Sequence, residues 1–175
     1  HKQAPVLAYT YTQHESATTG YLFAFNRQRN GEKYFRVQPE KLGLKGEVVV
    51  FDPVSEKMTD VQAGAYCTDT LPASGYAYYS IAPVNACGIA FFGDKGKIAA
   101  TGKKRIASII EAGDKLRIKV LFAPEENEIT LRGYSKHRIS ANKGDLQFDK
   151  ATGMFHLTIH KLSGKNDMNV ELKKI

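Results

Sequence analysis

Aspartates are the residues of this chain that could do acid–base chemistry, because two carboxylates that flank a glycosidic bond are enough to hydrolyse it. The candidates are Asp52, Asp60, Asp69 and Asp94. No spacing among them singles out one acid and one base, and any domain of this size carries acidic residues. We therefore expect no catalytic residue and no enzyme activity in this chain.

The other arrangements that carry chemistry are incomplete. A phosphate-binding loop needs Lys and then Ser or Thr after its last glycine, whereas Gly93 is followed by Asp94. No serine stands in a Gly-x-Ser-x-Gly elbow. His156 and His160 would share one face of a strand about 13 Å apart, which is too far to chelate one ion. We expect no metal site and no cofactor.

Four tyrosines are the best candidates for binding rather than catalysis. They are Tyr66, Tyr76, Tyr78 and Tyr79. A tyrosine ring offers an apolar face and a hydroxyl, which suits stacking against a sugar ring. On one strand Tyr76 and Tyr78 share a face and Tyr79 takes the other, so at least one of them should belong to the core. The group favours carbohydrate binding as an alternative function.

The chain is basic, with 25 lysines and arginines against 18 acidic residues and a net charge of +7. A cluster of cations is formed by Lys95, Lys97, Lys103, Lys104 and Arg105. Such a patch can hold an acidic glycan or a phosphate backbone, or it is the solvated end of an exposed hairpin. Because nucleic-acid bases need aromatic stacking partners, which are sparse here, we expect no nucleic-acid partner.

The cysteines, the apolar runs and the first residue indicate in which environment the protein works. Cys67 and Cys87 form no Cys-x-x-Cys motif, and their spacing leaves open a disulfide or two separate buried thiols. There is no run of 18 or more apolar residues, so we expect no membrane span. The chain begins at His1 rather than Met, which favours a processed product or a fragment of a larger chain.

The elements that must position these residues are strands. Apolar and polar residues alternate with a period of two, which is typical of half-buried antiparallel strands. We expect strands near residues 5–13, 20–28, 32–37, 46–52, 75–84, 87–92, 97–100, 104–110, 115–122, 127–132, 145–149, 154–160 and 168–174. Asn30-Gly31 and residues 93–96 are expected to form hairpin turns.

The predicted fold is all-β with little helix, an antiparallel two-sheet β-sandwich of the jelly-roll or Greek-key type. Residues 39–44 are expected to form one helical turn. The length favours a single domain over residues 1–175, and residues 111–114 are the place where a subdomain could begin.

Three successive segments resemble a known family. They are Phe23-Ala24-Phe25-Asn26-Arg27, Leu42-Gly43-Leu44-Lys45-Gly46 and Val48-Val49-Val50-Phe51-Asp52. This succession resembles the accessory β-sandwich that follows the catalytic barrel in many bacterial glycoside hydrolases, notably the α-galactosidase-like group. In that group a Trp usually follows the strand that ends in Asp, whereas here Pro53 follows it and the chain has no Trp. Residues 71–84 and 88–98 fit the same pattern, so the resemblance covers roughly residues 5–160.

The resemblance implies a non-catalytic accessory or structural module of a secreted bacterial glycoside hydrolase. It implies a secreted, periplasmic or cell-surface location, and the catalytic domain of the same parent chain as partner. Because the family's catalytic carboxylates lie on the barrel, none can be carried over to this chain. Two alternatives remain, a carbohydrate-binding module that uses the tyrosines and a surface adhesion domain whose partner is a protein.

Overall fold

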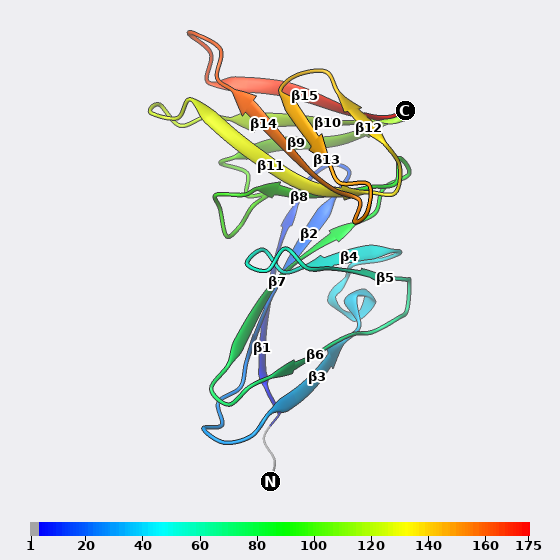
Figure 1. Cartoon of the computed structure of the whole chain (residues 1–175), viewed down its shortest axis with the longest axis vertical. Coiled ribbons are helices and arrows are strands. Elements are labelled where there is room, and N and C mark those ends of the chain that lie inside the picture. The colour runs from blue at the N-terminus through cyan, green and yellow to red at the C-terminus, as the bar shows by residue number, and fades with distance from the viewer. Residues whose placement is uncertain (1–3) are drawn as a thin grey trace. The chain divides into compact units, whose positions relative to one another are not determined.

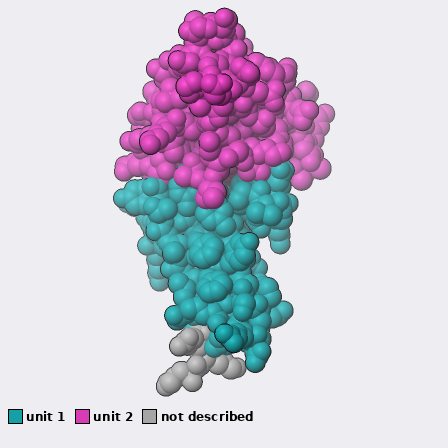
Figure 2. Space-filling view, turned by 90° about the vertical axis from the view of Figure 1, so that its left-hand side faces the viewer, with its two compact units in different colours: residues 1–11, 19–83 teal, residues 12–18, 84–175 magenta. Residues whose placement is uncertain are grey.

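The computed structural model describes residues 4–175, so residues 1–3 of the expected domain lie outside the described residues. The regular secondary structure of the described residues is β-strand apart from one 3-10 helix, so the predicted all-β class is confirmed (Figure 1). It divides into two compact units (Figure 2). Unit 1 holds the residues up to 11 and residues 19–83, and unit 2 holds residues 12–18 and 84–175. The division therefore falls after Pro83 rather than near residues 111–114.

Unit 1 is built on a five-stranded sheet in the order β1-β2-β7-β4-β5, with β3 and β6 paired as a separate ribbon. The bounds are β1 Val6–Gln13, β2 Thr18–Phe25, β3 Lys33–Val37, η1 Pro39–Leu42, β4 Val48–Phe51, β5 Met58–Val61, β6 Cys67–Leu71 and β7 Tyr76–Pro83. Apolar side chains of the sheet and of the ribbon form one buried cluster, which includes Leu22, Val50, Ile81, Phe35 and Leu71.

Unit 2 is an antiparallel β-sandwich of two four-stranded sheets, in the orders β12-β15-β10-β9 and β13-β14-β11-β8. The bounds are β8 Ile89–Asp94, β9 Ile106–Ala112, β10 Lys115–Leu121, β11 Glu128–Ser135, β12 Ile139–Ala141, β13 Asp145–Phe148, β14 Met154–His160 and β15 Asp167–Lys174. Its core takes side chains from both sheets, such as Ile118 and Val170 from one and Leu131 and Leu157 from the other.

The period-two pattern correctly predicted which side chains are buried in unit 2. Leu116, Ile118 and Val120 of β10 are at most 2% exposed, whereas Arg117 of the same strand points to solvent. The expected break at residues 111–114 is the turn of a hairpin, because Ala112 of β9 pairs directly with Lys115 of β10.

Two hairpin predictions are wrong. Residues 97–100 are not a strand, because the chain folds back on the end of β8 and the Asp94 amide donates to the Ala100 carbonyl at 2.9 Å. Asn30-Gly31 does not join paired strands, because β2 pairs with β7 and β3 pairs with β6. A turn motif predicts that the chain changes direction. It does not show that the strand before the turn pairs with the strand after it.

The two cysteines are separate buried thiols. Neither forms a disulfide, Cys67 lies in unit 1 and Cys87 lies in unit 2. Burial raises the pKa of both thiols, because a thiolate loses hydration in an apolar environment. Within residues 4–175, the structure contains no helix long and apolar enough to cross a membrane.

Candidate functional site

An exposed aromatic pair lies on the outer face of the β2–β7 strand pair in unit 1. The rings of Phe23 and Tyr76 are stacked, with centroids 6.0 Å apart and planes 24° from parallel. They are diagonal neighbours across the two strands, because Phe25 pairs with Tyr76 and Phe23 pairs with Tyr78. Tyr76 is 71% exposed and Phe23 is 40% exposed. A flat apolar surface of this kind can pack against the face of a sugar ring.

The other predicted tyrosines have different surroundings. Tyr78 lies on the same face as Tyr76 and is half-buried, and its burial raises the pKa of the phenol. Tyr79 points into the core, where its hydroxyl donates to the Asp69 carboxylate and its ring packs against Phe35. Tyr79 is thus a structural tyrosine, as the strand alternation required of at least one of them.

Tyr66 does not belong to the β2–β7 surface. It precedes β6, and the guanidinium carbon of Arg36 on β3 lies 4.6 Å from its ring centroid. This is a cation–π contact on the β3–β6 ribbon. The structure therefore places Tyr76 and Tyr78 on one face with Phe23, a residue that was not among the predicted site residues. The strand alternation alone could not find Phe23, because the partner of β2 was unknown.

The carboxylates considered for hydrolysis contact other parts of the chain. Asp52 Oδ1 accepts hydrogen bonds from the amides of Val54 and Ser55, which closes the turn between β4 and β5. Asp60 Oδ1 accepts a hydrogen bond from the Gln62 amide side chain at 3.3 Å. Each of these groups therefore has a structural contact.

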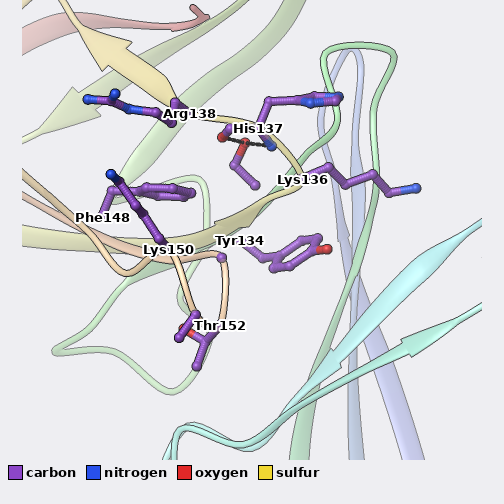
Figure 3. Close-up of a pocket in the computed structure, with 10 residues that line it drawn as sticks. Tyr134, Lys136, His137, Arg138, Phe148, Lys150 and Thr152 are labelled. Atoms are coloured by element: carbon purple, nitrogen blue, oxygen red, sulfur yellow. Dashed lines mark hydrogen bonds between the residues drawn. The ribbon is translucent and has the colours of Figure 1, made fainter.

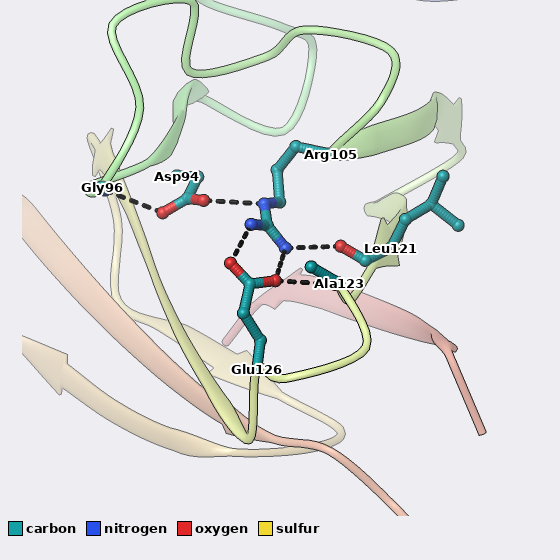
Figure 4. A network of polar contacts seen from close by, with 6 residues as sticks. All are labelled: Asp94, Gly96, Arg105, Leu121, Ala123 and Glu126. Atoms are coloured by element: carbon teal, nitrogen blue, oxygen red, sulfur yellow. Dashed lines mark hydrogen bonds and ion pairs between the residues drawn. The ribbon is translucent and has the colours of Figure 1, made fainter. Parts of the chain in front are cut away.

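Asp94 belongs to a buried charge network centred on Arg105, at the ends of β8 and β9 (Figure 4). Arg105 Nε lies 2.8 Å from Asp94 Oδ2, and both side chains are less than 10% exposed. The guanidinium also makes a two-pronged contact with Glu126, and Nη1 donates to the Leu121 carbonyl at 2.6 Å. Planar, bidentate pairing of this kind is the geometry that Arg provides and Lys does not.

The five residues of the predicted basic cluster have different surroundings in the structure. Lys97 and Lys104 line a pocket of about 420 Å³ together with Ile98 and Phe122. Arg105 also borders this pocket, but its charge is compensated by Asp94 and Glu126. Lys95 and Lys103 are exposed and do not line it. The pocket is thus mainly apolar with two lysines at its border, rather than a five-cation patch.

Glu126 gives the network a pH dependence. Hydrogen bonding to Arg105 lowers the pKa of Glu126 from 4.5 to about 2. The unfolded chain therefore takes up this proton at a higher pH than the folded chain, so acid favours unfolding. The stability that Glu126 contributes is complete above about pH 4.5 and is lost as the pH falls towards 2.

We predict that Glu126→Gln lowers the free energy of unfolding most at neutral pH. The difference from the wild type should shrink as the pH falls from 4.5 to 2, because in that window Glu126 takes up a proton in the unfolded wild-type chain before it does so in the folded chain. Urea unfolding at a series of pH values measures it, and the exposed neighbour Glu125→Gln controls for the loss of one carboxylate. A difference that stays constant down to pH 2 would contradict the assignment.

A second pocket lies in unit 2 between the end of β11 and the β13–β14 turn (Figure 3). It has a volume of about 330 Å³. Its lining includes Lys136, His137, Arg138 and Lys150 with the aromatic residues Tyr134 and Phe148. The sequence pattern does not single out these residues, because Arg138 and Lys150 are twelve positions apart and only the fold brings them to one pocket.

Among the described residues, no group of three or more His, Cys, Asp or Glu side chains could hold a metal ion. No family model matches the chain, and no curated protein matches it either.

Proposed function

We propose that this chain is a non-catalytic accessory β-module of a secreted bacterial glycoside hydrolase, partnered by the catalytic domain of its parent chain. The observation that carries the proposal is the role of Asn26, a residue of the segment that resembles the family. Asn26 is 1% exposed, and its side-chain amide donates to the carbonyls of Gly31 and Pro72 at 3.1 and 2.9 Å. A polar residue used in this way stabilises loops and is not free to contact a substrate.

The acidic residues support the same reading. Asp52 ends the third segment of resemblance and caps a turn, Asp69 accepts from Tyr79, and Asp94 is paired with Arg105. A general acid or base must reach the proton that it transfers. Carboxylates that are committed to turns and buried pairs serve the fold, which is what an accessory module requires of them.

The reading frame of the encoding gene tests the partnership. The proposal expects the frame upstream of the His1 codon to continue into a catalytic barrel domain. A frame that begins shortly before His1, with no room for a catalytic domain on either side of the chain, would overturn it.

Carbohydrate binding is the second candidate function, and the Phe23–Tyr76 pair favours it. Removing one stacked ring should weaken glycan binding roughly 2- to 12-fold, since aromatic contacts of this kind contribute about 0.5–1.5 kcal/mol. A glycan array on the isolated chain, followed by titration of Tyr76→Ala and Phe23→Ala, measures this. Tyr34→Ala is a matched control, because Tyr34 is 62% exposed but lies on β3.

The two candidates give different results on the array. Binding that is weakened by Tyr76→Ala and Phe23→Ala but kept by Tyr34→Ala would establish a carbohydrate-binding surface. Equal weakening by all three variants would exclude the β2–β7 surface as the binding site. A silent array would contradict the carbohydrate-binding function and favour the accessory role.

A further inference from the structure

We propose that unit 2 binds the anionic group of an acidic saccharide, a carboxylate or a sulfate ester, in the pocket between residues 134–138 and 148–153. The volume of about 330 Å³ lies within the range of small-ligand sites, about 300–1,000 Å³. The saccharide part of the assignment rests on the proposed function, whereas the anion part rests on the pocket itself.

The walls of the pocket are held in place by internal hydrogen bonds. The Ser135 amide donates to the Gly153 carbonyl at 2.8 Å, which ties the two walls together. The Ser135 hydroxyl donates to the His137 carbonyl at 2.7 Å and accepts from the His137 amide at 3.2 Å. Asp149, which does not line the pocket, stabilises the turn that carries the other wall, because its Oδ1 accepts from the Ala151 amide. A site fixed in this way needs little ordering when a ligand binds.

Gly153 allows the two walls to approach closely. Its φ of +78° is in the left-handed region, and a Cβ at this position would lie 2.6 Å from the Tyr134 ring. Any larger residue would push Tyr134 away from the turn. The tight turn therefore sets the separation between the basic residues at positions 136–138 and Lys150 on the other wall.

The charged side chains that line the pocket are basic, which favours an anionic ligand. Lys136, His137, Arg138 and Lys150 line the pocket, and no Asp or Glu does. Within residues 4–175, the side chains of Arg138 and Lys150 make no ion pair or hydrogen bond with another residue. A guanidinium fork with a nearby ammonium group suits a planar carboxylate or a sulfate.

The aromatic lining suits a ring attached to that anion. Arg138, Lys150, Phe148 and Tyr134 all line the pocket, and Figure 3 shows the Arg138 and Lys150 side chains on the same side of it as the ring of Phe148. Phe148 also packs against the core of the sandwich, so its ring is fixed. An apolar face next to two cations matches a sugar ring that carries one acidic substituent.

Titration of the whole chain with four probes tests the proposal. The probes are glucuronate, glucose 6-sulfate, glucose and inorganic sulfate, each followed by chemical-shift changes or calorimetry. Arg138→Ala and Lys150→Ala should each weaken binding of the acidic sugars about 10-fold, because each removes one charge-assisted contact. Lys165→Ala is the control, since Lys165 is exposed and lies outside the pocket.

The outcomes of the titrations distinguish the anion site from its saccharide part. Binding of the acidic sugars that needs Arg138 and Lys150 but not Lys165 supports the whole proposal. Binding of sulfate with the same dependence, but of no sugar, supports the anion site and refutes its saccharide part. Equal binding of glucose, an equal effect of Lys165→Ala, or binding of no probe would overturn the anion site. None of these results bears on whether the chain hydrolyses glycosides, so the two proposals fail separately.

Discussion

Replacing Arg105 with methionine should lower the free energy of unfolding by about 3–5 kcal/mol, because it leaves a buried carboxylate without its counter-charge. Asp94 is 5% exposed, and its carboxylate would lose the ion pair that Arg105 Nε makes with Oδ2 at 2.8 Å. The Leu121 carbonyl would also lose the hydrogen bond that it accepts from Arg105 Nη1. Urea unfolding at neutral pH measures the change, which should be among the largest for a single substitution in unit 2.

Two further variants separate the buried network from a general effect of charge. Lys104→Met removes a cation from the adjacent, exposed position and should change stability by no more than about 0.5 kcal/mol. Arg105→Lys keeps the charge but cannot contact Asp94, Glu126 and the Leu121 carbonyl together, so its stability should be intermediate. If Arg105→Met were as mild as Lys104→Met, the network would have only the strength of a surface ion pair.

Replacing Asn26 with alanine should lower the free energy of unfolding by about 2–4 kcal/mol, because several buried polar groups lose their partner at once. Besides the contacts of its amide with Gly31 and Pro72, Asn26 Oδ1 accepts from the Gln28 amide at 3.0 Å. The side chain thus joins the end of β2 to the loop before β3 and to the loop after β6, which lie at the same end of the β3–β6 ribbon. Thermal or urea unfolding, followed by a probe in unit 1, measures the loss.

The matched variants for this prediction are Asn30→Ala and Asn26→Asp. Asn30 is exposed in the same turn, so its replacement should be nearly neutral. An aspartate at position 26 can only accept hydrogen bonds, so it would face the carbonyls of Gly31 and Pro72 with a negative charge. It should therefore be at least as destabilising as alanine. Equal stability of Asn26→Ala and Asn30→Ala would contradict the structural role of Asn26.

Most strands of the two units could be predicted from the sequence, because burial of one face of a strand imposes a period of two. Segments such as β10 and β14 carry that period in full, with Leu157 and Ile159 completely buried. The strands β5, β6 and β12 could not be found in this way. They have three to five residues and few apolar side chains, so their backbone pairing, rather than their pattern, makes them strands.

The division into two units could not be predicted from local signals. Residues 12–18 belong to unit 2, although the strands on either side of them contribute to unit 1. Turn residues report where the chain bends, and residues 111–114 are such a bend. Whether a bend separates two units depends on long-range contacts between strands. The positions of glycines and other turn residues do not predict those contacts.

The candidate sites also depend on strand pairing and long-range contacts that the sequence alone did not predict. The alternation along β7 correctly placed Tyr76 and Tyr79 on opposite faces, but Phe23 joined the surface only through the pairing of β2 with β7. Arg105 was grouped with neighbouring lysines because charge is visible in a sequence. Its partner Glu126 is 21 positions away, and only the fold brings the two side chains together and buries Arg105.

The central claim, that the module is non-catalytic and uses its carboxylates for its own fold, is tested most directly by assaying the purified chain against a panel of nitrophenyl glycosides. The account predicts no release of nitrophenol above the level of buffer, and the same result for Asp52→Asn, Asp60→Asn and Asp69→Asn. Turnover that purifies with the chain and disappears in one of these variants would contradict it.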